Sequence, residues 1–118
     1  EIDQGIGGRI GTVVGTNLWR LTAKTTEEDP GHQVLCITHL PQLAGFGDVH
    51  YRVAKEIVEG RTVTHVTPLP PEERVAELAQ MLGTSGAAAV RGAHEILEQA
   101  TATKARLSGL QPPILADC

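Results

Sequence analysis

One apolar run has the pattern of a strand buried on both faces of a sheet, and it constrains the fold more than any other feature. This run, Gln33-Val34-Leu35-Cys36-Ile37-Thr38, is short and continuous and ends at His39. A single parallel strand cannot form a sheet, so its neighbours have to come from a hairpin further along the chain or from outside it. The sequence therefore predicts an α/β unit that is incomplete without an N-terminal half.

A helical pattern precedes this run. From Arg9 to about Ala23, apolar residues recur at helical spacing, namely Ile10, Val13, Val14, Leu18 and Leu21. Gly11 and Gly15 lie on another stripe of the same helix, where they lower helix propensity but permit close approach of a neighbour. We therefore expect a helix that packs tightly against another element.

Patterns for a short helix, a hairpin and two longer helices follow the run. Pro41 opens a short helix through Ala44. Two β-branched runs, 50–58 and 61–67, flank Glu59-Gly60 and predict a β-hairpin. Residues 72–82 form an amphipathic pattern whose inner face is Val75, Leu78, Ala79 and Leu82. Residues 86–107 form another, with the inner face Val90, Ala93, Ile96, Leu97 and Ala100. Residues 1–110 are expected to form one unit, and 111–118 a loose tail.

Composition narrows the functional classes. The 118 residues carry a formal net charge of -4, which argues against a non-specific nucleic-acid surface on this segment, although other regions of a larger protein can bind DNA. The two cysteines, Cys36 and Cys118, give no disulfide framework, which is typical of a reducing, cytoplasmic setting. No apolar run approaches the ~18 residues of a membrane span, and no signal peptide is recognisable.

Two positions can carry chemistry. Glu1 heads an acidic, glycine-rich stretch, and a glutamate just past a strand can orient or deprotonate a water aimed at a phosphate. His39 follows the apolar run, where an imidazole can hydrogen-bond a terminal phosphate. Each has a plainer alternative: a solvated loop whose glycines serve turns, and a histidine bonded to backbone. The pairing of the two, separated by a helix, favours a nucleotide-hydrolysing site.

The remaining polar residues are weaker candidates. The other histidines lack paired zinc-ligand spacing; they are His32, His50, His65 and His94. Cys36 and His39 would point to opposite faces of a strand, which disfavours a metal pair. Arg74 and Arg91 lie on predicted helices and are expected to be solvated.

Two stretches together resemble the C-terminal head segment of the RecN family, bacterial DNA repair proteins in the SMC-like branch of the ABC ATPases. They are Glu1-Ile2-Asp3-Gln4-Gly5-Ile6-Gly7-Gly8 and His32-Gln33-Val34-Leu35-Cys36-Ile37-Thr38-His39-Leu40-Pro41-Gln42-Leu43-Ala44. The likeness continues through residues 46–48, 51–55, 60–62 and 73–83, and so covers most of the chain to about residue 100.

The resemblance implies roles by position. Glu1 matches the catalytic glutamate that ends the Walker B motif, and His39 matches the switch histidine that contacts the γ-phosphate. Gln42 lies one turn further on and is a secondary candidate. The D-loop, which reaches across a head dimer, is matched by Asp3, Gln4, Gly5, Ile6, Gly7 and Gly8. The implied fold is the C-terminal lobe of an ABC/SMC-type P-loop ATPase head, with a parallel strand, an edge hairpin and flanking helices.

The departures from the family pattern concern nucleotide binding. The chain contains no G-x-x-x-x-G-K-S/T phosphate loop and no Leu-Ser-Gly-Gly signature, and the Walker B aspartate would directly precede Glu1. Gly7 stands where many D-loops carry an aspartate. Without the phosphate loop, we expect the chain alone neither to bind ATP tightly nor to hydrolyse it. No metal site is expected within it.

For the whole protein, the resemblance implies ATP and Mg²⁺ as ligands. It also implies three partners: the N-terminal half of the head, a second head in an ATP-dependent dimer, and DNA bound through other regions. The implied location is the bacterial cytoplasm, in association with the nucleoid, and no membrane contact is expected.

Two other interpretations remain open. The glycine turn and helices could form a non-catalytic protein–protein interaction module, or the chain could belong to another ABC-type ATPase without a repair role. The sequence upstream of Glu1 discriminates among them, since a β-branched run ending in aspartate would establish the ATPase interpretation.

Overall fold

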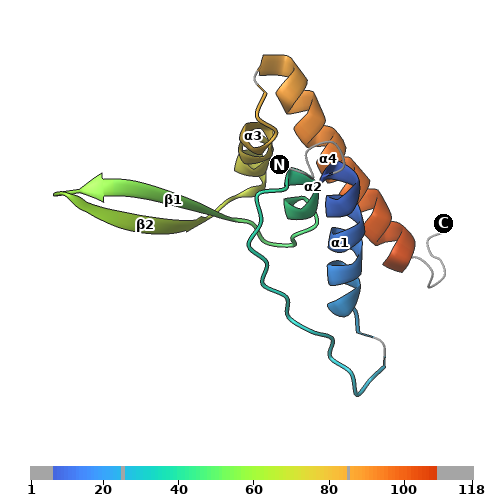
Figure 1. Cartoon of the computed structure of the whole chain (residues 1–118). Helices are drawn as coiled ribbons and strands as arrows, with labels where there is room; N and C mark the ends of the chain where they lie inside the picture. Colours follow the sequence, from blue (N-terminus) through green and yellow to red (C-terminus); the bar gives the residue numbers. More distant parts are fainter. Residues whose placement is uncertain (1–6, 25, 85, 109–118) are drawn as a thin grey trace.

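The computed structural model describes residues 7–24, 26–84 and 86–108 (Figure 1). Within these ranges, helices gather into a body from which a two-stranded antiparallel hairpin extends. The elements in chain order are α1 (Gly7–Leu21), α2 (Pro41–Ala44), β1 (Tyr51–Val58), β2 (Arg61–Pro68), α3 (Pro71–Met81) and α4 (Gly86–Ser108). The predicted helices and hairpin are all present, with boundaries shifted by at most two residues.

The core lies between α3 and α4. Leu78 is fully buried, and Ala79 packs with it against Ala89 and Ala93 of α4. Burial of one leucine side chain contributes about 1.5–3 kcal/mol. The prediction that Val90 faces inward is wrong, because α4 turns its alanines toward α3 and leaves Val90 exposed. Alanines at the contact let the two helices approach closely.

Helix α2 lies at the centre of the body and contacts α1, α3 and α4. The glycine stripe of α1 faces it, as expected from the sequence: a Cβ on Gly15 would lie 2.5 Å from Phe46 Cδ2. Phe46, just after α2, is buried against this stripe. As a consequence the larger apolar residues of α1 point outward, and the exposed ones are Ile10, Val13, Val14 and Leu21.

The hairpin forms around the turn that the sequence indicates. Val58 pairs with Arg61, so the loop is the dipeptide Glu59-Gly60. Both residues have positive φ, 51° and 77°, as a type I′ turn requires. Its register continues to Tyr51 opposite Pro68, and the backbone N–H of Leu69 donates to His50 O at 2.8 Å just beyond. Nearly all residues of both strands are exposed.

The strand predicted at residues 33–38 is not formed, and this part of the fold prediction is wrong for the chain as it stands. The segment is not helical and pairs with no strand among the described residues. Leu35 and Ile37 are 88% and 93% exposed, the reverse of the burial expected for a central strand. Among the described residues, β1 and β2 pair only with each other, so the hairpin does not extend to residues 33–38. We call residues 33–38 the unpaired run.

No helix in the described ranges is both long enough and apolar enough to cross a membrane.

Candidate functional site

His39 lies at a bend between the unpaired run and α2. The backbone N–H of Leu40 donates to Thr38 Oγ1 at 2.9 Å, which closes a side-chain turn around His39. Pro41 then begins α2, since its ring presets the helical φ and its missing N–H costs nothing in a first turn. The His39 side chain is exposed. The turn therefore presents the imidazole outward on a defined stretch of backbone.

The first half of α1 packs against α2, the helix that follows this turn. A Cβ on Gly11 would lie 3.1 Å from Gln42 Cβ and 3.2 Å from the backbone nitrogen of Leu43. The absence of a side chain at Gly11 is what permits this approach. Gln42 is half-buried at the contact, which gives it a packing role, and its role as a ligand stays a prediction. Helix α1 thus contacts the helix that directly follows the histidine turn.

The other predicted site residues are only partly placed. Gly7 and Gly8 form the first turn of α1 rather than the end of a loop. The remaining members of the predicted set lie outside the described residues, namely Glu1, Asp3, Gln4, Gly5 and Ile6. Of the two predicted catalytic residues, Glu1 therefore lies outside the described residues and His39 lies within them.

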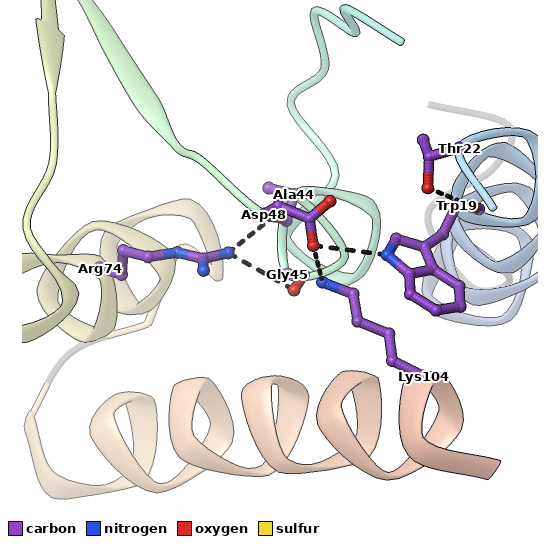
Figure 2. Close-up of polar contacts among 7 residues, drawn as sticks. All are labelled: Trp19, Thr22, Ala44, Gly45, Asp48, Arg74 and Lys104. Carbon is purple, nitrogen blue, oxygen red and sulfur yellow. Dashed lines mark hydrogen bonds and ion pairs between the residues drawn. The ribbon is translucent and has the colours of Figure 1, made fainter. Parts of the chain in front are cut away.

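Arg74 makes contacts that the sequence patterns do not predict. The expectation that it is solvated is wrong: it is half-buried, and its Nη2 donates to Ala44 O at 3.2 Å and to Gly45 O at 3.4 Å. Figure 2 shows the guanidinium reaching from α3 to the end of α2. Burial lowers the pKa of Arg74, while the charge of Asp48 opposes that shift. Arg91, by contrast, is exposed as predicted.

Asp48 ties the segment after α2 to two further helices. Its Oδ1 accepts a hydrogen bond from Trp19 Nε1 of α1 at 3.4 Å and lies 3.0 Å from Lys104 Nζ of α4 (Figure 2). The ammonium of Lys104 also lies 5.8 Å from the centre of the Trp19 ring. The Asp48 side chain is 64% exposed, so its ion pair is worth at most about 1 kcal/mol.

Metal ligands do not gather in the described part of the chain. No group of three histidine, cysteine or carboxylate side chains could hold an ion there. His65 Nε2 instead lies 3.0 Å from Glu56 Oε1 on the hairpin. Burial lowers the pKa of His50, the nearby Arg74 charge lowers it further, and Glu77 raises it.

Comparison with known proteins gives a consistent set of relatives. No protein-family model matches the chain. It is 39% identical over 106 residues to the DNA repair protein RecN of Bacillus subtilis, an alignment that covers 88% of this chain and 17% of the relative. The RecN protein of Xylella fastidiosa is 46% identical over 83 residues, covering 70% of this chain and 14% of the relative.

The RecN protein of Deinococcus radiodurans is 44% identical over 98 residues, covering 82% of this chain and 16% of the relative. The chain thus spans only about a sixth of the length of these curated relatives.

Proposed function

The chain belongs to the RecN family, and from that premise we propose that it forms part of the ATPase head of a protein that acts in DNA double-strand-break repair. In this proposal the chain contributes the C-terminal lobe of the head. It brings Glu1, the D-loop residues and His39 to a nucleotide held between two heads. Hydrolysis would release the heads and drive work on DNA bound by other regions.

The observation that carries the proposal is the contact between α1 and α2. The predicted site is split between two stretches, 1–8 and 38–42, that are separated by a helix. The approach of Gly11 to Gln42 and Leu43 brings α1, which follows the first stretch along the chain, against α2, which follows the turn that holds His39. A site divided in this way along the chain can assemble only if these two segments meet in space.

His39 fits the role of a phosphate contact. Its imidazole is exposed at a bend whose backbone is constrained on both sides, by the Thr38 hydroxyl and by Pro41. A single N–H donated to the terminal phosphate would favour the charge that develops there during transfer. Glu1 would orient the attacking water. Mg²⁺ would accompany the nucleotide in this proposal.

The unpaired run supports the proposal that the rest of the head is a partner. Leu35 and Ile37 are almost fully exposed, and within the described residues no other backbone group pairs with the backbone of 33–38. Backbone N–H and C=O groups need partners once a strand is buried, and a run apolar on both faces is suited to the middle of a sheet. Neighbouring strands from the N-terminal half of the head would supply both the pairing and the cover.

The switch role can be tested in the full-length protein that contains this sequence. We expect His39→Ala to lower kcat for ATP hydrolysis by about 10²–10³, the usual effect of removing one donor to a developing charge. Glu1→Gln should suppress turnover while ATP binding persists. His94→Ala, at an exposed position of α4, is the matched control and should leave kcat unchanged. Unchanged turnover in His39→Ala would contradict the assignment.

A further inference from the structure

A one-turn helix, α2, separates His39 from the core, and its position depends on its neighbours. Its backbone hydrogen bonds run from Ala44 N to Leu40 O at 3.0 Å and from Gly45 N to Pro41 O at 2.9 Å. Helices of so few residues are not stable by themselves, because nucleation is unfavourable. The neighbours of α2 therefore decide where it sits, and with it where the preceding turn presents His39.

Two of these neighbours, α1 and α4, contact α2 through van der Waals packing. Gly11 of α1 abuts Gln42 and Leu43, and a Cβ on Gly45 would lie 2.6 Å from Ile96 Cγ2 of α4. Both contacts limit how closely α2 can approach, but neither contains a directional bond. Apolar packing of this kind tolerates small sliding or rotation of a single turn.

Arg74 supplies a directional contact. Its Nη2 donates to the carbonyls of Ala44 and Gly45, at 3.2 and 3.4 Å. The carbonyl of Ala44 also accepts the backbone N–H of Gly47 at 3.1 Å, so Arg74 is a second donor to that oxygen. A cationic side chain near the last carbonyls of a helix interacts favourably with them. A half-buried guanidinium with two carbonyl acceptors fixes both the distance and the direction of α2 relative to α3.

We propose that Arg74 is a positioning residue for the switch: by holding the C-terminal end of α2 against α3, it sets where His39 stands relative to the nucleotide. This inference rests on the proposed function of His39. Arg74 does not touch substrate and acts through α2. Loss of its hydrogen bonds would let α2 shift, and displacement of a catalytic group by about 1 Å can cost on the order of 10²-fold in rate.

The test compares ATP hydrolysis by variants of the full-length protein. Arg74→Met keeps an unbranched apolar stem but removes the guanidinium and its donors, and Arg74→Lys retains a charge and one donor group. Arg91→Met, at an exposed arginine of α4, is the matched control. We expect Arg74→Met to lower kcat on the order of tenfold to a hundredfold with KM little changed. Arg74→Lys should recover part of the loss, and Arg91→Met should have no effect.

The double variant His39→Ala/Arg74→Met separates positioning from an independent role. If Arg74 acts through His39, the double variant should be no slower than His39→Ala alone, since the effects of residues that act as a unit are not additive. Losses that multiply, or a normal kcat in folded Arg74→Met beside an impaired His39→Ala, would overturn the inference. An unimpaired His39→Ala would instead refute the proposed function.

Amide hydrogen exchange gives a readout that does not depend on turnover. In Arg74→Met the amides of Leu43, Ala44 and Gly45 should exchange faster, while those of β1 and β2 keep the wild-type rate. If Arg74→Met does not fold, the same measurement on Arg74→Lys decides the question. Wild-type exchange at all three α2 amides in a folded variant would show that Arg74 does not hold α2.

Discussion

The hairpin and the unpaired run have similar β-type sequences, but only the hairpin forms strands. In the hairpin, β1 meets β2 across a two-residue turn, so the two strands that pair are consecutive along the chain. Within the described part of the chain, residues 33–38 have no such neighbour, and the apolar side chains of Leu35 and Ile37 are exposed to solvent. The comparison shows that strands consecutive along the chain pair here, whereas a run without a consecutive neighbour does not.

The first prediction contrasts the core with the unpaired run. In the isolated chain Leu78→Ala should lower the free energy of unfolding by about 2–5 kcal/mol, because it empties a fully buried position. Ile37→Ala should change it by less than about 0.5 kcal/mol, because Ile37 is exposed. Urea denaturation followed by circular dichroism measures both values.

The same substitution at Ile37 should behave differently in the full-length protein. If the missing strands cover the unpaired run, Ile37→Ala there should cost about 2 kcal/mol or more. A small effect in both settings would remove the reason to place residues 33–38 in a larger sheet, and would leave the run as a solvent-exposed connection.

The second prediction tests whether the turn alone holds the hairpin. Gly60 has φ of +77°, and no atom lies within 4 Å of the position that a Cβ would take, so Gly60→Ala acts only through the backbone. We expect the hairpin to lose about 1–2 kcal/mol, measured as faster amide exchange in β1 and β2 with α3 and α4 unchanged. Gly60→Asn is the control, since asparagine tolerates positive φ better. Unaltered exchange in Gly60→Ala would mean that contacts other than the turn maintain the hairpin.

The elements that the sequence predicts correctly are those with signals from residues close along the chain. Pro41 and the Glu59-Gly60 pair act within a few residues, and the short helix and the hairpin both form where they indicate. The position of His39 directly before the short helix is predictable for the same reason. The strand at 33–38 does not form as predicted, because an apolar β pattern reflects a residue's surroundings in a whole sheet, and among the described residues no strand lies beside this run.

Val90 of α4 is exposed, contrary to prediction, for another reason. In α1 and α4 the smallest residues face inward, Gly11 and Gly15 in one and Ala89 and Ala93 in the other. Hydrophobic periodicity ranks the larger residues as the inner face, but close helix approach rewards small ones. The contacts of Arg74 escape prediction because its acceptors, the carbonyls of Ala44 and Gly45, lie some thirty residues away and become neighbours only in the folded chain.

The smallest expected effect concerns the junction between the hairpin and the helical body, where His50 lies. Burial and the charge of Arg74 lower the pKa of His50 below its ordinary 6.5, and Glu77 only partly opposes them. The folded chain therefore resists protonating His50, while the unfolded chain takes up the proton near pH 6.5. The stability that the neutral imidazole provides is present above that pH and declines as the pH falls toward the lower pKa of the folded state.

Thermal unfolding at pH 7.5 and at pH 5.5 should show this decline, and His50→Gln should reduce the drop in Tm between the two values. His94→Gln, at an exposed position, is the control and should keep the wild-type drop. Hydrogen exchange should place the acid sensitivity at the base of the hairpin, where Leu69 donates to His50 O, before it reaches α3 and α4. An equal drop in Tm for His50→Gln and wild type would show that the junction does not respond to protonation of His50. The boundary between hairpin and body would then depend on packing alone.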